Sequence, residues 1–395
     1  MMSGKSFLQK SGPFLLVAPL FLFICLFFIW PLGSVLTQSV SDNAVARLLP
    51  ETAKVASSWD GESPPGEDLQ AAFVTDLRAA ATDEQAVGDM VRRLNSAQSG
   101  FRTLMSKTLK AVQETPEGPI DLVTLDRKWS QPQYWKAITD ALSPTTDRYL
   151  LAAVDLMRND AGEIFSQPPE QTINVAIFGR TFWISATVTI FCVLLGYPYA
   201  LLITVATGWK KQALLAAVLL PLWTSLLVRT AAWFILLQEQ GLINSALMDL
   251  NIIANPLALI FNRTGVIIAM THVSLPMMVL PIYSVLLTIP KNLMPAAASL
   301  GAHPLRAFVR VLLPLSFGGI AAGSLLVFMS AIGYYITPAL IGGAGDQMIS
   351  SFIAFHAQNS GNWGMASALG IVLLVVTIIL YAVYDRLATQ RERSA

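Results

Sequence analysis

Long apolar runs alternate with short polar segments along most of the chain, and one long polar segment interrupts this alternation. The apolar runs cover residues 14–36 and about 177–205, 212–237, 264–288, 312–333 and 364–384. Each run is long enough to cross the hydrocarbon core of a bilayer, which takes roughly 20 helical residues. The first run is too long and too aromatic for a cleaved signal peptide. The pattern therefore predicts an all-α polytopic membrane protein with six transmembrane helices.

The polar segment, residues 37–172, is predicted to form a large helical insert after the first span. Apolar residues recur at helical spacing over roughly 83–113 and 146–160, with Pro- and Gly-rich turns elsewhere. About 136 residues are enough for a small helical domain. We therefore divide the chain into an N-terminus with the first transmembrane helix (1–36), the insert (37–172), a five-helix core (173–390) and a tail (391–395).

Charge is scarce and unevenly distributed. Only 13% of the residues are charged, against roughly 25% in soluble domains. Residues 37–172 hold 13 Lys/Arg and 20 Asp/Glu, a balance of −7, whereas the rest holds 13 and 5, a balance of +8. This partition excludes a single soluble core and a nucleic-acid-binding protein with a basic face. The acidic insert suits a basic partner or solute, although a solvated helical elaboration is the simpler interpretation.

The basic residues outside the insert indicate how the chain crosses the membrane. Ten of these 13 flank the apolar runs on one side: Lys5, Lys10, Lys210, Lys211, Lys291, Arg306, Arg310, Arg386, Arg391 and Arg393. The short loops expected on the other side, 238–263 and 334–363, carry only Arg263. Because cytoplasmic loops are enriched in Lys and Arg, we predict that both termini are cytoplasmic and that the insert is extracytoplasmic.

Motifs for independent catalysis are missing from the sequence. It contains no G-x-x-x-x-G-K-[ST] phosphate loop, no H-E-x-x-H and no G-x-S-x-G, and its three histidines are dispersed. The two cysteines, Cys25 and Cys192, lie in apolar runs and imply no disulfide framework. We therefore expect no catalytic residues, no metal site and no cofactor bound by this chain.

The segment between the fourth and fifth runs is rich in proline and alanine. It predicts a short helix with Pro295 in its first turn, small alanines along it and a stop at Gly301, and a second helical piece starting near Pro304. A small-residue helix on a basic cytoplasmic loop can fit closely into another protein.

This segment resembles the coupling-helix motif of ABC-importer permeases, E-A-A-x-x-x-G followed nine residues later by I-x-L-P. Ala296, Ala297, Gly301, Leu313 and Pro314 match in register, Val311 replaces the Ile, and Pro295 replaces the Glu. The resemblance implies an ATPase-coupling helix at about 293–306. The coupling residues would be Pro295, Ala296, Ala297, Gly301, Arg306, Leu313 and Pro314.

Two further stretches, residues 223–244 and 328–343, resemble the spermidine/putrescine-type permeases of that family. The resemblance implies a bacterial inner-membrane subunit of an ATP-driven importer. Its partners would be a cytoplasmic ATPase dimer holding ATP and Mg, a second permease subunit in a heterodimer, an extracytoplasmic solute-binding protein and the lipid bilayer, without nucleic acid. The solute would be a small polyamine. Opine-like or amino-acid-derived solutes remain an alternative, because relatives that handle putrescine often carry an acid where this chain has Tyr334.

Polar and aromatic residues near the span ends are candidates for the solute path. They are Trp223, Thr224, Arg229, Glu239, Tyr334, Tyr335 and Asp346. An intramembrane Arg229 either faces a cavity or partner or extends its head group to the interface. Tyrosines can bind ammonium groups or simply anchor at the interface. Glu239 can attract a cation or pair with Arg229, and Asp346 offers a carboxylate, although both also suit plain surface loops.

Two other classes of membrane protein also fit parts of this sequence. A sensor would use residues 37–172 as a ligand domain, but it also needs a cytoplasmic output domain, which we do not expect here. A secondary carrier needs no ATPase and often shows repeated halves with broken helices. No such internal repeat is evident in the sequence.

Overall fold

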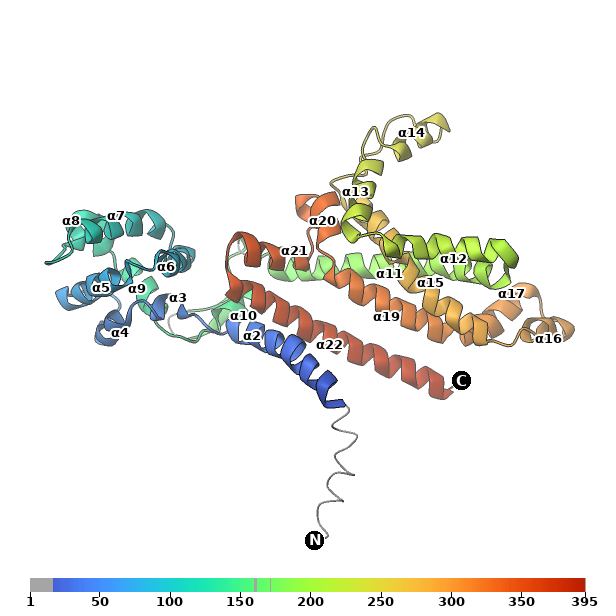
Figure 1. Cartoon of the computed structure of the whole chain (residues 1–395), viewed down its shortest axis with the longest axis horizontal. Coiled ribbons are helices and arrows are strands. Elements are labelled where there is room, and N and C mark those ends of the chain that lie inside the picture. The colour runs from blue at the N-terminus through green and yellow to red at the C-terminus, as the bar shows by residue number, and fades with distance from the viewer. Residues whose placement is uncertain (1–16, 160–161, 171, 395) are drawn as a thin grey trace, which may run out of the picture. The chain divides into compact units, whose positions relative to one another are not determined.

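The structure, a computed structural model, describes residues 17–159, 162–170 and 172–394 (Figure 1). The chain divides into two compact units, residues 1–150 and residues 151–395. Each unit has a separate hydrophobic core. Lys5 and Lys10 of the predicted N-terminal segment lie outside the described residues.

The first apolar run forms a helix over Val17–Gln38, which includes a π-helical turn (Cys25–Ile29) and α2 (Trp30–Gln38). Its large apolar side chains are exposed, with Trp30 69% accessible. Such a surface is stable in lipid, and the length is sufficient for one crossing. The predicted first span is therefore confirmed as an apolar helix, except for residues 14–16, which are not described.

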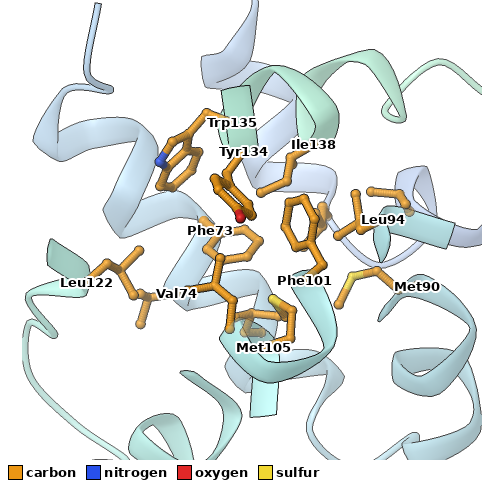
Figure 2. Close-up of a cluster of buried hydrophobic side chains, with 14 of the residues drawn as sticks. Phe73, Val74, Met90, Leu94, Phe101, Met105, Leu122, Tyr134, Trp135 and Ile138 are labelled. Atoms are coloured by element: carbon orange, nitrogen blue, oxygen red, sulfur yellow. The ribbon is translucent and has the colours of Figure 1, made fainter. Parts of the chain in front are cut away.

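The remaining helices of the first unit surround an aromatic core (Figure 2). They are α3 (Asn43–Ala46), α4 (Pro50–Ala56), α5 (Glu67–Ala80), α6 (Glu84–Ala97), α7 (Phe101–Glu114), α8 (Leu122–Leu125), the 3-10 turn Arg127–Ser130, α9 (Pro132–Asp140) and the start of α10 (Arg148–Ala153). Phe73 lies 5.2 Å from Trp129 and 5.4 Å from Trp135, measured between ring centroids. The two indole N–H groups donate to Thr108 Oγ1 and to the Trp129 carbonyl, respectively. Burial therefore leaves neither indole unsatisfied.

The structure corrects both helical stretches expected in the insert. The stretch 83–113 is two helices, α6 and α7, because the backbone becomes extended at Gln98 (φ −136°) and is left-handed at Gly100 (φ +98°), which precedes α7. The Asn95 side chain accepts from the Gly100 and Arg102 backbone N–H groups and fixes this turn. The stretch 146–160 is helical only to Ala153. A hairpin of β1 (Leu156–Arg158) and β2 (Ile164–Ser166) follows, after left-handed Asp155.

The second unit contains the other apolar helices. They are α11 (Asn174–Val205), α12 (Gly208–Trp223), α13 (Leu226–Leu236), α14 (Leu242–Asp249), α15 (Arg263–Thr288), α16 (Leu293–Ser299), α17 (Pro304–Ala307), the π-turn Phe308–Leu312, α18 (Leu313–Leu315), α19 (Phe317–Gly333), α20 (Ile336–Ile341), the 3-10 turn Ala344–Asp346, α21 (Ile349–Ala354), the π-turn Phe355–Asn359 and α22 (Trp363–Ser394). Four helices among the described residues of the whole chain are long and apolar enough to span a membrane. The number is six if each of two bent pairs, α12 with α13 and 304–315 with α19, forms one span.

Helices α11, α15 and α19 pack side by side at the centre of the second unit (Figure 1). Small residues allow this close approach, as is common between membrane helices. A Cβ atom on Gly319 of α19 would lie 2.9 Å from the Ile282 Cα atom of α15, and one on Gly196 of α11 would lie 2.9 Å from Met278 Cγ. These glycines bring the backbones of neighbouring helices together. The helix faces that contain them form the core of the unit.

Candidate functional site

The segment between α15 and α19 turns sharply after the short helix α16. The Ala302 N–H donates to the Ala297 carbonyl, and the Gly301 N–H donates to the Ala298 carbonyl. With Gly301 at φ +80°, this is the Schellman pattern that ends a helix. The His303 side chain then accepts from the Leu305 N–H at the start of α17. The predicted short helix, its stop at Gly301 and the restart near Pro304 are confirmed.

Most of this segment is exposed. No residue of α16 is buried, and Leu300 and Leu305 are 88% and 67% accessible. Pro295, Ala296, Gly301 and Arg306 are also exposed, while Ala297 is half-buried. The result is a small-residue helix flanked by two exposed leucines and a cation, which is a surface suited to a protein partner.

The end of the segment is anchored in the core of the second unit. Leu313 is half-buried and packs with Phe308 against the core, whereas Pro314 is exposed at the start of α18. The Tyr197 hydroxyl lies 2.9 Å from Ser316 Oγ and ties α11 to the start of α19. A force applied at α16 would therefore reach the packed helices through Leu313 and its neighbours.

Several basic residues lie on α12 and on the segment that follows α15. Lys211, near the start of α12, lies 5.5 Å from the ring centroid of Tyr283 in α15. Lys291, Arg306 and Arg310 belong to the neighbouring segment that follows α15. The placement of these cations on the cytoplasmic side stays a prediction.

A second polar group lies between α13, α15 and the residue after α19. We call Arg229, Trp233, His272, Ser274 and Tyr334 the Arg229 cluster. Trp233 Nε1 donates to His272 Nδ1 at 3.0 Å, and the two rings meet edge to face. Arg229 lies one helical turn before Trp233, and Trp233 and Tyr334 pack against the same core. Three segments distant in sequence therefore contribute to one site.

Several polar atoms of this region have no partner among the described residues. The Nε atom of Arg229 is shielded from solvent and makes no hydrogen bond, and the same holds for the Ser274 and Thr271 hydroxyls. Because an indole N–H can only donate, His272 Nδ1 must be the acceptor, and a neutral ring then carries its proton on Nε2. The cluster thus presents the guanidinium, the imidazole N–H and hydroxyl groups, all of which can donate hydrogen bonds.

The other candidates for the solute path are not members of this cluster. Trp223, 82% accessible, and Thr224 form the 104° bend between α12 and α13. Glu239 is exposed after α13, and no carboxylate among the described residues pairs with Arg229. Tyr335 is 42% accessible. Asp346 is an ion-pair partner, with Arg263 Nε 3.1 Å from its Oδ1.

The hydrogen bond from Trp233 to His272 joins α13 to α15. The sequence alone does not connect Trp233 or Ser274 with Arg229. The available signal was the spacing of Arg229 and Trp233, four residues apart and hence on one helical face. Their meeting with α15 depends on the tertiary fold.

Comparison with known proteins gives a family match that lies within the second unit. Residues 173–393 match the family described as binding-protein-dependent transport system inner membrane component. The spermidine/putrescine transport system permease protein PotB of Haemophilus influenzae is 33% identical over 245 residues, which cover 60% of this chain and 86% of that protein. PotB of Escherichia coli is 35% identical over 198 residues, 50% of this chain and 72% of that protein. The family match begins after the insert.

Solved structures are more distant. A bacterial alginate ABC transporter, crystallised with a periplasmic protein bound to an alginate pentasaccharide, contains a chain that is 17% identical with a TM-score of 0.46. The match covers 55% of this chain and 78% of that chain.

Proposed function

Because the chain belongs to the family of binding-protein-dependent transport system inner membrane components, we propose that it is the permease subunit of an ATP-driven importer. It is a multi-pass inner-membrane protein of a non-enzymatic transport family. ATP and Mg bind to a separate cytoplasmic ATPase dimer. A second permease subunit completes the membrane part as a heterodimer.

The observation that carries this proposal is the exposed segment α16–α17. Its backbone turn at Gly301 and its small side chains leave room for a close protein contact, while Leu313 anchors it in the core. The ATPase holds this segment, and its closure on ATP moves α15 and α19, which the segment joins. Movement of these helices switches the solute path between an outward-open and an inward-open state. This switch requires the closed ATPase to bind the two states with different affinities.

The solute is a small organic amine of the spermidine/putrescine type, a choice supported by the names of the PotB relatives. An extracytoplasmic solute-binding protein delivers it. The cations gathered near α16 support the placement of this end and of both termini in the cytoplasm, with residues 37–172 outside. An amino-acid-derived amine is the second candidate, favoured by the donor groups around Arg229.

A pair of exposed leucines, one directly after α16 and one in α14, provides the test. Leu300, at the end of α16, is 88% accessible and Leu242, at the start of α14, is 70% accessible. Neither change removes core packing, so Leu300→Ser should weaken co-purification of the ATPase by about tenfold, while Leu242→Ser leaves it unchanged. Equal ATPase retention by the two variants would show that α16 is not the docking element.

A further inference from the structure

We propose that a groove between α6 and α7 of the insert is the docking site for the extracytoplasmic solute-binding protein, which places an apolar side chain flanked by carboxylates there. This inference rests on the proposed import function and assigns one of its partners to a surface. The surface belongs to a part of the chain that precedes the family match at residues 173–393.

The groove has an apolar floor and a volume of about 490 Å³. Val87 and Val91 of α6 and Leu109 of α7 form this floor, and all three belong to the aromatic core or pack against it. Other side chains of the same two helices, among them Met90 and Met105, are buried in that core (Figure 2). An apolar floor with a polar rim is the usual composition of a protein interface.

A glycine inside a helix keeps the groove open. Gly88 lies in the middle of α6 and lines the groove. A Cβ atom added there would meet only Arg92 Nη1, at 4.0 Å, so packing within the insert does not require a glycine. Glycine in a helix interior is less favourable than alanine. The space beside Gly88 is therefore available to a side chain that enters from outside.

The charges around the groove select the partner. Arg92 and Arg102 line it together with one acid, Glu84. Arg92 also pairs with Asp89, whereas Arg102 has no ion pair among the described residues. The insert as a whole carries a balance of −7. An acidic partner is therefore repelled by most of the insert and attracted at the groove, which orients the encounter.

The solute-binding protein of a polyamine importer has the required chemistry. A protein that binds a small polycation needs carboxylates around its cleft, because a desolvated ammonium group must be paired. The mouth of such a cleft is an acidic surface. This protein is also the partner that we expect in the same compartment as residues 37–172.

The groove is preformed on a framework held by long-range contacts. The Asp42 N–H donates to the Pro144 carbonyl and the Thr146 N–H donates to the Val40 carbonyl, which joins the two ends of the helical part of the insert. Arg93 Nε of α6 lies 2.6 Å from Asp42 Oδ2, and both side chains are buried. Because α6 is fixed to this junction before a partner binds, docking requires little ordering of the groove.

The test measures binding of the polyamine-loaded solute-binding protein to the permease pair with its ATPase in nanodiscs, by biolayer interferometry. Gly88→Leu fills the groove, and Arg102→Glu reverses a charge on its rim. Each change should weaken binding by about tenfold or more. Leucine has a higher helix propensity than glycine, so Gly88→Leu should leave α6 folded and the insert resistant to protease.

Matched control variants carry the same kinds of change outside the groove. Ala71→Leu adds a large apolar side chain at an exposed position of α5, and Arg127→Glu reverses an exposed charge that does not line the groove. Both controls should bind the solute-binding protein as the parent does.

Three results overturn the inference: binding by either groove variant within about twofold of the parent, an equal loss in the controls, or no binding by a parent complex that retains its ATPase. Self-association that Gly88→Leu abolishes, with unchanged affinity for the solute-binding protein, also overturns it, because a second copy of the chain then occupies the groove. The comparison of Leu300 with Leu242 tests ATPase docking without the solute-binding protein, so the two failures are distinguishable.

Discussion

Two adjacent glycines of α19 allow a sharp test of helix packing in the second unit. A Cβ atom added to Gly319 would lie 2.9 Å from the Ile282 Cα atom, 3.0 Å from the Pro281 carbonyl oxygen and 3.1 Å from Val285 Cβ. A Cβ atom added to Gly318 would meet nothing within 4 Å. Backbone atoms cannot move aside as a flexible side chain does, so Gly319→Ala must push α19 away from α15, whereas Gly318→Ala fits.

The size of the effect follows from this difference. Both variants gain the same helix propensity, about 0.5–1 kcal/mol, which cancels in the comparison. What remains is the overpacking of a tight contact, about 1–3 kcal/mol. A domain of this size shifts in Tm by roughly 2–4 °C per kcal/mol, so Gly319→Ala should unfold about 2–12 °C below Gly318→Ala.

Cys192 provides the reporter for this measurement. It is fully buried in α11, and its Sγ lies 3.5 Å from the Thr271 carbonyl oxygen of α15. In a Cys25→Ser background it is the remaining cysteine, so a thiol-reactive dye reports opening of the helix packing on heating in detergent. Unfolding of the two alanine variants within about 1 °C of each other would refute the packing argument.

Three further predictions concern the insert and its junction with α11, all measured on the full chain. Trp135→Ala should destabilise the first unit by about 3–5 kcal/mol and make it sensitive to protease, because the side chain is fully buried. Asp155→Ala should destabilise the first turn of α11 by about 1–2 kcal/mol, seen as faster hydrogen exchange there, because the carboxylate accepts from the Asn174 and Val175 N–H groups. The hydrogen bond from Lys107 lowers the pKa of Asp126, so its contribution to stability is present above the unfolded pKa and lost as the pH falls through the folded pKa. Protease resistance of the insert should therefore decline in acid, and Asp126→Asn should remove that part of the decline.

Much of the local structure of the membrane unit could be predicted from the sequence. Apolar length located the spans, and the stop at Gly301 and restart at Pro304 followed from residue chemistry that acts over a few positions. The insert was harder. Its helical periodicity continues across Gly100, so only the backbone of the structure, extended at Gln98 and left-handed at Gly100, shows that α6 and α7 are separate.

The two candidate sites also differ in how far the sequence could predict them. The coupling segment is contiguous, so its residues could be named in order along the chain. The Arg229 cluster combines α13, α15 and Tyr334, and sequence alone offered Arg229 either a cavity or the interface. The structure adds that Arg229 Nε lacks a partner and that Asp346 is paired with Arg263.

The sequence by itself determined that this chain is a helical membrane protein, which loops are basic and where the short helix proposed for ATPase coupling begins and ends. Hydropathy, charge placement and turn chemistry are properties of consecutive residues, so they are visible without a fold. Only the tertiary structure decided which helix faces touch and which polar groups share a site. Those contacts join residues as distant as Thr230 and Thr337, whose hydroxyls lie 3.1 Å apart, and close packing of whole helices is what brings them together.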